Sequence, residues 1–258
     1  MARFDVNFFS YTLHHGVSIT VTIPTFTPCD YKPDETPSHQ VAQKFPVLYL
    51  LHGHGNDHQC WTRYTSAERL AEEQRIAIVT FNTQNKAYNN CPNGDLYYDF
   101  LNTELHDFVC SMFPVSTRRE DTYIAGLSMG GYGTLAHALT NPGRYCAFGA
   151  MSPGVSGCRL GETPKNPGIR VIEPILELQK RIEEGAELPK GYICCGKQDF
   201  LYDRVAAFAA DAESLGAGFT WHPVDGFEHE WRYWDMELAN FLRWIPRTDY
   251  YADKPHKV

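Results

Sequence analysis

Apolar and polar residues alternate along this chain in two regular ways, and each way predicts a different element. Short, mostly apolar segments are typical of strands buried within a parallel sheet. They cover residues 45–51, 76–81, 123–127, 147–151, 192–196 and 219–224. Apolar residues three or four apart predict helices, which fall at 65–74, 95–113, 129–140, 175–185, 205–215 and 231–241. Because strands and helices follow each other in turn, we expect an α/β fold with a mostly parallel central sheet and helices on both faces.

The N-terminal residues follow a different pattern. Apolar residues at alternate positions in 4–23 predict two antiparallel strands that open the sheet. The proline-containing stretch 24–44 is expected to be a loop. The chain therefore starts with an antiparallel addition to the parallel sheet.

Two later segments carry more detailed expectations. Asp95 is expected to cap a long helix whose buried stripe comprises Leu101, Leu105, Phe108 and Met112. Residues 152–170 are rich in proline and glycine and predict an excursion over the site. We expect one domain over 1–258, with a cap-like excursion at 152–185.

Composition and charge narrow the class of protein. The chain has 258 residues, of which 43% are hydrophobic, enough for one well-packed core. Its net charge is −8 and no basic stripe appears, so nucleic acid is not expected as a partner. No segment approaches the roughly 18 apolar residues of a membrane span. The start lacks a charged-then-apolar leader and the cysteines are scattered, which predicts reduced thiols and a cytoplasmic protein.

The strongest chemical signal is G-x-S-x-G, formed by Gly126, Ser128 and Gly130 between a predicted strand and a predicted helix. That context is typical of a nucleophile elbow, in which the serine sits on a strained turn with its hydroxyl exposed. The alternative is a glycine-rich turn that only packs, which leaves the polar residue at its apex unexplained. We therefore predict that Ser128 is a catalytic nucleophile.

A loop with three histidines, 52–58, follows an earlier predicted strand. A metal site is disfavoured, because no matching carboxylate or cysteine cluster accompanies these histidines. A glycine-rich loop in this place instead offers backbone N–H groups to an oxyanion. We expect one donor from His54 or Gly55 and a second from Met129, each worth about 3–4 kcal/mol to the transition state.

A serine needs a base, and the base needs an orienting acid. His229 lies between the last predicted strand and the last helix, whereas the other histidines after Ser128 are expected inside elements or in the tail: His137, His222 and His256. Asp199 directly follows a predicted strand and is the expected acid. Asp203 is the second choice, since its position is typical of an ordinary helix cap. Asp225 is close to His229 in sequence and is expected to be too near to reach the far side of its ring.

These residues predict acyl transfer without a metal or an organic cofactor. His229 would take the proton from Ser128, which attacks an ester carbonyl, and water would then release the acid. Aromatic residues near the same predicted edge of the sheet could hold an acyl or sugar ring, with core packing as the alternative. The predicted substrate-binding residues are Gly55, Trp61, Tyr88 and Trp231.

Several motifs resemble, in order and over nearly the whole chain, the esterase D superfamily and its tributyrin-esterase branch, which is related to feruloyl and acetyl esterases. The motifs are Leu50-Leu51-His52-Gly53, Phe81-Asn82-Thr83, Arg119-Glu120-Asp121, Gly126-Leu127-Ser128-Met129-Gly130, Cys195-Gly196-Lys197-Gln198-Asp199-Phe200 and Gly226-Phe227-Glu228-His229-Glu230-Trp231. One departure is His54, where the branch commonly has an apolar residue. The resemblance implies an α/β-hydrolase fold, the triad of Ser128, Asp199 and His229, and often a homo-oligomer. The expected reaction is hydrolysis of short-chain or aromatic acyl esters, with acetyl, butyryl or feruloyl groups on small alcohols or plant-derived saccharides.

Two other functions remain open from the sequence. An S-formylglutathione hydrolase belongs to the same superfamily and would use the same residues on a thioester. An acyltransferase or a catalytically silent binding protein could also use this fold. The complete set of serine, acid and histidine argues against the silent form, and the ester itself is left undetermined.

Overall fold

The computed structural model describes residues 1–91, 94–163, 172–254, 256 and 258. Its strands are β1 (Ala2–Ser10), β2 (His15–Ile23), β3 (Val47–Leu51), β4 (Ala77–Phe81), β5 (Thr122–Leu127), β6 (Ala147–Met151), β7 (Lys190–Gly196) and β8 (Thr220–Val224). Its α-helices are α1 (Cys60–Tyr64), α2 (Ala67–Gln74), α3 (Tyr97–Asp99), α4 (His106–Met112), α5 (Met129–Thr140), α6 (Pro174–Glu183), α7 (Tyr202–Ser214) and α8 (Trp231–Trp244). Three short helices of other kinds are η1 (Pro28–Asp30), η2 (Phe100–Leu105) and η3 (Arg119–Asp121).

The described strands form one sheet in the order β1-β2-β4-β3-β5-β6-β7-β8. β1 and β2 are antiparallel to each other, and β2 is antiparallel to β4. All other neighbours are parallel, from the β3–β4 pair to the β7–β8 pair. The predicted parallel sheet and its antiparallel N-terminal strands are confirmed.

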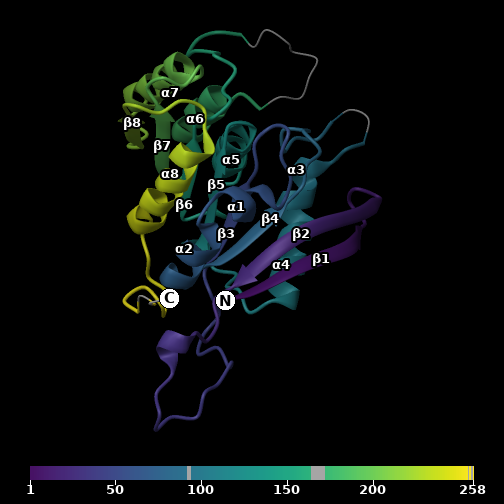
Figure 1. The fold of residues 1–258 in the computed structure, drawn as a ribbon. Helices are drawn as coiled ribbons and strands as arrows, with labels where there is room; N and C mark the ends of the chain where they lie inside the picture. The colour runs from purple at the N-terminus through teal and green to yellow at the C-terminus, as the bar shows by residue number, and fades with distance from the viewer. Residues whose placement is uncertain (92–93, 164–171, 255, 257) are drawn as a thin grey trace.

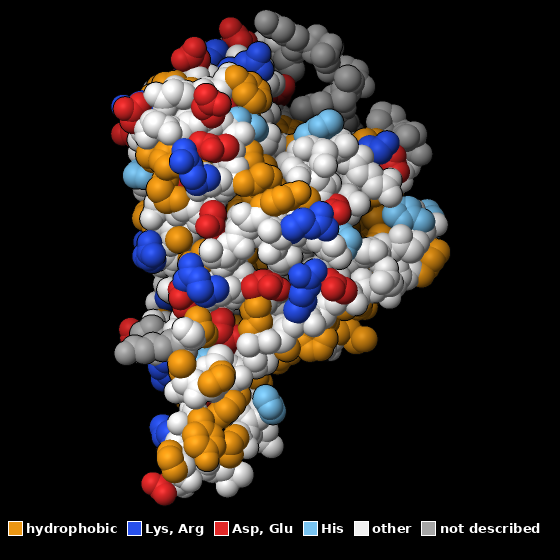
Figure 2. Space-filling model, in the orientation of Figure 1, with side chains coloured by type: hydrophobic (Ala, Val, Ile, Leu, Met, Phe, Trp, Pro, Cys, Tyr) orange, Lys and Arg blue, Asp and Glu red, His pale blue; other side chains and the backbone are white. Residues whose placement is uncertain are grey.

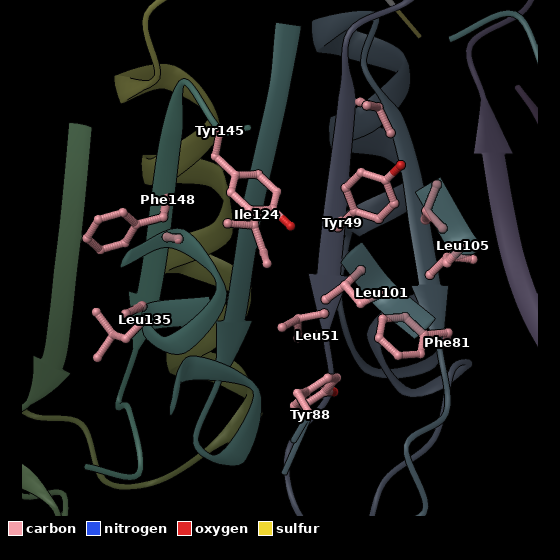
Figure 3. Packing of buried hydrophobic residues seen from close by; sticks show 14 of the residues in the cluster. Tyr49, Leu51, Phe81, Tyr88, Leu101, Leu105, Ile124, Leu135, Tyr145 and Phe148 are labelled. Carbon is pink, nitrogen blue, oxygen red and sulfur yellow. The ribbon is translucent and has the colours of Figure 1, made fainter. Parts of the chain in front are cut away.

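Helices cover both faces of the sheet, as the alternation along the chain predicts (Figure 1). Side chains point to opposite faces at successive strand positions, so β3 sends Leu48 and Leu50 into one core and Tyr49 and Leu51 into the other. The first core also holds apolar residues of α1, α2 and α8. The second holds residues of η2 and of α4 to α7, and Figure 3 shows part of it around Tyr49.

The helix predicted over 95–113 is interrupted, which corrects two expectations. It starts at Tyr97 rather than after a cap by Asp95, and its middle, Phe100–Leu105, is a π-helix. A π-helix has more residues per turn than an α-helix, so the apolar stripe rotates along the axis. As a result Met112 is 67% exposed instead of buried.

The π-helical segment also has a long-range partner. Glu104 is 3% exposed, and its carboxylate accepts hydrogen bonds from the Ser10 hydroxyl and the Tyr11 and Thr12 amides in the β1–β2 turn. These bonds lower the pKa of Glu104 although burial alone would raise it. The N-terminal hairpin is thereby tied to the π-helical segment η2.

The excursion predicted at 152–185 is described only in part. Residues 164–171 lie outside the described residues, so the prediction of a cap there stays a prediction. Its C-terminal part forms α6, which packs against α5 and α7.

The surface carries charges of both signs. Figure 2 shows Lys and Arg side chains interspersed with Asp and Glu on the face in view. Among the described helices, none has the length and apolar composition needed to cross a membrane.

Candidate active site

Ser128 sits at the turn between β5 and α5 with φ 53° and ψ −115°, a backbone conformation that is strained for a residue with a side chain. The turn is tight because its glycines lie against backbone. A Cβ added to Gly126 would lie 2.6 Å from the carbonyl of Gly130, and one added to Gly130 would lie 2.4 Å from the carbonyl oxygen of Leu51. Both contacts are closer than real Cβ atoms allow, which explains why the motif needs glycine at these two places.

Neighbouring strands hold the elbow in position. The Ser128 amide donates to the carbonyl of Met151 over 2.9 Å, and the Ser128 carbonyl accepts from the Gly154 amide over 2.9 Å. The side chain of Ser128 is partly exposed although the strand before it is buried. The serine is therefore presented at the carboxyl end of the sheet, where ligands collect in parallel α/β folds.

Asp199 and His229 are joined by a hydrogen bond of 2.7 Å between Asp199 Oδ2 and His229 Nδ1. The carboxylate side chain is fully buried, whereas the imidazole side chain is 19% exposed. Burial alone would raise the pKa of Asp199, but hydrogen bonds from His229, from the Leu201 amide and from Ser152 outweigh it and lower that pKa. Asp199 is therefore an ionised acceptor at neutral pH, which is the state that orients a neutral histidine.

The topology explains why these three residues lie at the same edge of the sheet. Ser128 follows β5, Asp199 follows β7 and His229 follows β8, and these strands are parallel and lie in one half of the sheet. The loops after β7 and β8 are tied together, since the Gln198 amide donates to the Phe227 carbonyl over 3.1 Å. The order of the strands thus brings Ser128 and His229, about 100 residues apart in sequence, to the same edge of the sheet.

The other candidate bases and acids have different partners. His137 is buried and contacts Asn102 and the Tyr88 carbonyl, His222 faces Glu237, and His256 lies buried between Glu72 and Asp30. Asp203 is exposed in the first turn of α7. Asp225 accepts from the Gln198 side chain.

The loop after β3 is pinned through the buried His52. Its Nε2 accepts from the Thr83 amide and its Nδ1 lies 2.8 Å from the Gly53 carbonyl oxygen, so the ring is neutral with its proton on Nδ1. Burial lowers the pKa of His52, in agreement with a neutral ring. The Tyr88 hydroxyl donates to the His52 carbonyl over 2.9 Å. His52 therefore holds the backbone of this loop in place through buried hydrogen bonds.

One of the two proposed oxyanion donors in this loop is already used. The Gly55 amide donates to Asn85 Oδ1 over 2.7 Å. That leaves the backbone N–H of His54 as the donor we propose from this loop. Met129 is the first residue of α5, where a backbone N–H has no partner within the helix, so it is the proposed second donor.

The structure places two of the aromatic residues predicted to bind substrate in the core. Trp61 is 1% exposed and its indole N–H donates to the Leu51 carbonyl. Tyr88 is fully buried and packs among the core side chains shown in Figure 3. Both side chains hydrogen-bond backbone carbonyls at 51–52, and we do not propose them as substrate contacts. Trp231 is partly exposed and packs edge-on against Trp61, so its role stays a prediction.

Phe200 is a residue that the sequence patterns missed. Its side chain is 76% exposed, yet its ring lies 4.7 Å from the ring of His229, centroid to centroid. Trp234 approaches the same imidazole edge-on, with centroids 4.8 Å apart. The position of Phe200 directly after Asp199 was the available signal, because a residue next to the predicted acid must lie near the predicted site.

We expect Asn85→Gly to lower kcat about tenfold with little change in KM, because the oxyanion loop loses its side-chain anchor while its N–H donors remain. Asn85 has φ 63°, so glycine removes the amide without adding backbone strain. Steady-state kinetics on p-nitrophenyl acetate measures the effect.

Gln84→Gly is the matched control for this prediction. Gln84 is the preceding residue, is exposed and has φ 48°, so the substitution changes the same loop without touching Gly55. An equal loss of kcat in both variants would show that loop flexibility, and not the Asn85 hydrogen bond, is responsible.

Comparison with known proteins identifies relatives over most of the chain. A family model described as "Putative esterase" matches residues 27–245. An acetyl esterase of Caldicellulosiruptor saccharolyticus is 26% identical over 270 residues, which cover 96% of this chain and 99% of that protein.

Solved structures are similar over nearly the full length. The substrate-bound fluorophosphonate-binding serine hydrolase F of Staphylococcus aureus is 30% identical with a TM-score of 0.80, covering 94% of this chain and 97% of that one. An S-formylglutathione hydrolase of the same organism is 29% identical with a TM-score of 0.79, covering 94% of this chain and 98% of that one. The predicted α/β-hydrolase fold is thereby confirmed.

Proposed function

This chain belongs to the esterase family whose model matches residues 27–245, the chain is a carboxylesterase, and we propose that it hydrolyses short-chain esters through an acyl-enzyme on Ser128. The observation that carries the proposal is the 2.7 Å hydrogen bond between Asp199 and His229 at the same edge of the sheet as the strained Ser128. An ionised acid, a histidine and a partly exposed serine are the parts that nucleophilic acyl transfer requires.

In the proposed cycle His229 Nε2 accepts the proton of Ser128 as the serine oxygen attacks the ester carbonyl carbon. The His54 and Met129 amides donate to the resulting oxyanion. Collapse of the tetrahedral intermediate breaks the bond to the alcohol oxygen, which takes the proton from His229. Water, deprotonated by the same histidine, then attacks the acyl-enzyme and releases the carboxylic acid and free Ser128. Asp199 stays ionised and stabilises the imidazolium in both halves.

We further propose that Phe200 contacts the ester. Packing an exposed aromatic ring against an apolar group is favourable because it removes apolar surface from water. The ring of Phe200 already lies beside His229, the proposed general base. The alcohol part leaves with a proton from His229, so the group nearest that base is the alcohol part. This favours esters whose alcohol is apolar or aromatic.

A second candidate function is thioester hydrolysis of the S-formylglutathione type. It is favoured by the likeness to the S-formylglutathione hydrolase of S. aureus at 29% identity. The same serine and histidine would serve, because a thioester carbonyl is attacked in the same way. Transfer of the acyl group to an alcohol would also begin from the same intermediate. The expectations of a homo-oligomer and of a cytoplasmic location stay predictions.

A substrate panel tests the proposal. We expect kcat/KM for p-nitrophenyl acetate and butyrate to exceed that for p-nitrophenyl decanoate, methyl ferulate and S-formylglutathione. The highest value with S-formylglutathione would replace the first proposal with the second. Product analysis in the presence of an added alcohol separates hydrolysis from acyl transfer, because transfer yields a new ester in place of the free acid.

A further inference from the structure

Ser152 occupies a strained and fully buried position directly after β6. It is a non-glycine residue with φ 43° and its side chain is inaccessible to solvent. Its amide donates to the Cys194 carbonyl over 2.8 Å, which ties it to β7. A strained, buried polar residue persists where surrounding contacts enforce it, and such residues gather at functional sites.

The hydrogen bonds around Ser152 have a defined direction. The indole Nε1 of Trp234 lies 3.3 Å from Ser152 Oγ. An indole N–H can only donate, so the hydroxyl oxygen accepts from Trp234. The single proton of the hydroxyl is then left for another acceptor, and the carboxylate whose pKa Ser152 lowers is that of Asp199.

Cys195 is a second, weaker donor beside the same groups. Its Sγ lies 3.9 Å from Ser152 Oγ, and burial, with the charge of Asp199, raises the pKa of the Cys195 thiol to about 12. The thiol therefore stays protonated and is a weak donor. The titratable groups that face Asp199 are this thiol from β7 and His229 from the loop after β8.

We propose that Ser152 is a positioning residue for the catalytic acid: its hydroxyl, aligned by the indole of Trp234, donates to Asp199 and holds the carboxylate where it accepts from His229. This inference rests on the proposed function, since it takes Asp199 as the acid of the triad. Four consecutive strands of the sheet, β5 to β8, then each lead into one member of the site: Ser128, Ser152, Asp199 and His229.

The arrangement fixes Asp199 from several sides. The carboxylate accepts from the Leu201 amide at Oδ1 over 2.8 Å and from His229 at Oδ2 over 2.7 Å. Ser152 adds a further donor from β6. Trp234 supports both partners, because its N–H bonds Ser152 while its ring lies edge-on to His229 at 86°. A carboxylate held in this way cannot turn away when the imidazole becomes charged.

The test is Ser152→Ala, assayed by kcat, KM and the pH profile of kcat/KM on p-nitrophenyl acetate. We expect kcat to fall about tenfold at an unchanged KM, the scale of one charge-assisted hydrogen bond. Without the hydroxyl, the negative charge of Asp199 is stabilised by one hydrogen bond fewer. The carboxylate then stabilises the protonated imidazole of His229 more strongly. The midpoint of the acid limb is therefore expected to move upward by about half a pH unit, a readout that does not depend on how much enzyme is folded.

Two further variants test whether the effect of Ser152→Ala depends on Trp234 and on Asp199. Trp234→Phe keeps a ring beside His229 but removes the N–H, so it is expected to move the midpoint in the same direction by a smaller amount. Ser152→Ala is expected to cause no additional loss in an Asp199→Asn background, because residues that act as a unit are not additive. Tyr123→Phe is the control for the loss of a buried hydroxyl: its hydrogen bonds are to Glu120 and Pro246 at the other end of β5, and it is expected to leave the midpoint unchanged.

An unchanged pH midpoint in Ser152→Ala, or the same fold loss of kcat in the Asp199→Asn background, would overturn the positioning role. Failure of the proposed function has a different signature. In that case Ser128→Ala and Asp199→Asn would themselves keep activity, whatever Ser152→Ala does.

Discussion

Ser128→Ala is expected to lower kcat for p-nitrophenyl acetate by about 10⁴-fold or more, while the protein stays folded. The loss follows from removing the atom that forms the acyl-enzyme, whereas the oxyanion donors are backbone groups and remain. Alanine keeps the Cβ, so the backbone strain at φ 53° is the same in both proteins. The thermal unfolding midpoint is therefore expected to move by only a few degrees, which circular dichroism measures.

A fluorophosphonate gives a second readout of the same prediction. It should add one phosphonyl group to the wild-type protein, on the peptide that contains Ser128, and none to Ser128→Ala. Ser214→Ala is the matched control, since that hydroxyl bonds the Asp211 carbonyl at the end of α7 and should be dispensable for both readouts. An active Ser128→Ala protein, or a phosphonate found on another residue, would end the acyl-enzyme proposal.

Asp199→Asn is expected to lower kcat by about 10³–10⁴-fold at neutral pH. The amide has nearly the shape of the carboxylate, so packing around this buried position is kept. What is lost is the negative charge that accepts from His229 Nδ1 over 2.7 Å and stabilises the imidazolium. The rate of fluorophosphonate labelling should fall in parallel, because it depends on the same activated serine.

Asp203→Asn provides the comparison for this acid. Asp203 is exposed in the first turn of α7, and its replacement should leave kcat essentially unchanged. A large loss in Asp203→Asn together with an active Asp199→Asn would show that the acid has been assigned to the wrong residue. Loss in both variants, with intact folding, would point to a wider electrostatic requirement than a single triad acid.

The elements that the sequence predicted best are those in which independent signals coincide. α5 was expected at 129–140 and is observed over those residues, because an apolar strand, a glycine motif and a terminal Asn141-Pro142 all bound it. β6 likewise runs from 147 to 151 as expected. The prediction of a helix at 95–113 was less accurate, because the spacing of apolar residues was interpreted with a constant number of residues per turn. Its π-helical segment is supported by the long-range bonds of Glu104 to the β1–β2 turn.

The side chains of the site also differ in how well the sequence predicted their positions. The hydrogen bond between Asp199 and His229 was expected from their places after successive strands. Trp61 and Tyr88 have the residue type of substrate contacts, yet their rings point into the core and hydrogen-bond the backbone of 51–52. A residue type does not tell which way a ring points, because that depends on the packing of distant segments. Asn85 and Ser152 lie outside any motif for the same reason.

The sequence by itself determined the class of fold and the strand-to-helix turn at Ser128, and it predicted the order of serine, acid and base. These follow from local periodicity, from glycines that a tight turn needs, and from the rule that sites form at the carboxyl ends of parallel strands. Only the tertiary structure decided which loop N–H is already used and which side chains surround Asp199. It showed that the Gly55 amide donates to Asn85 and that the Trp234 indole donates to Ser152. Such contacts join residues 30 to about 80 positions apart, and only the packing of the whole chain brings them within hydrogen-bonding distance.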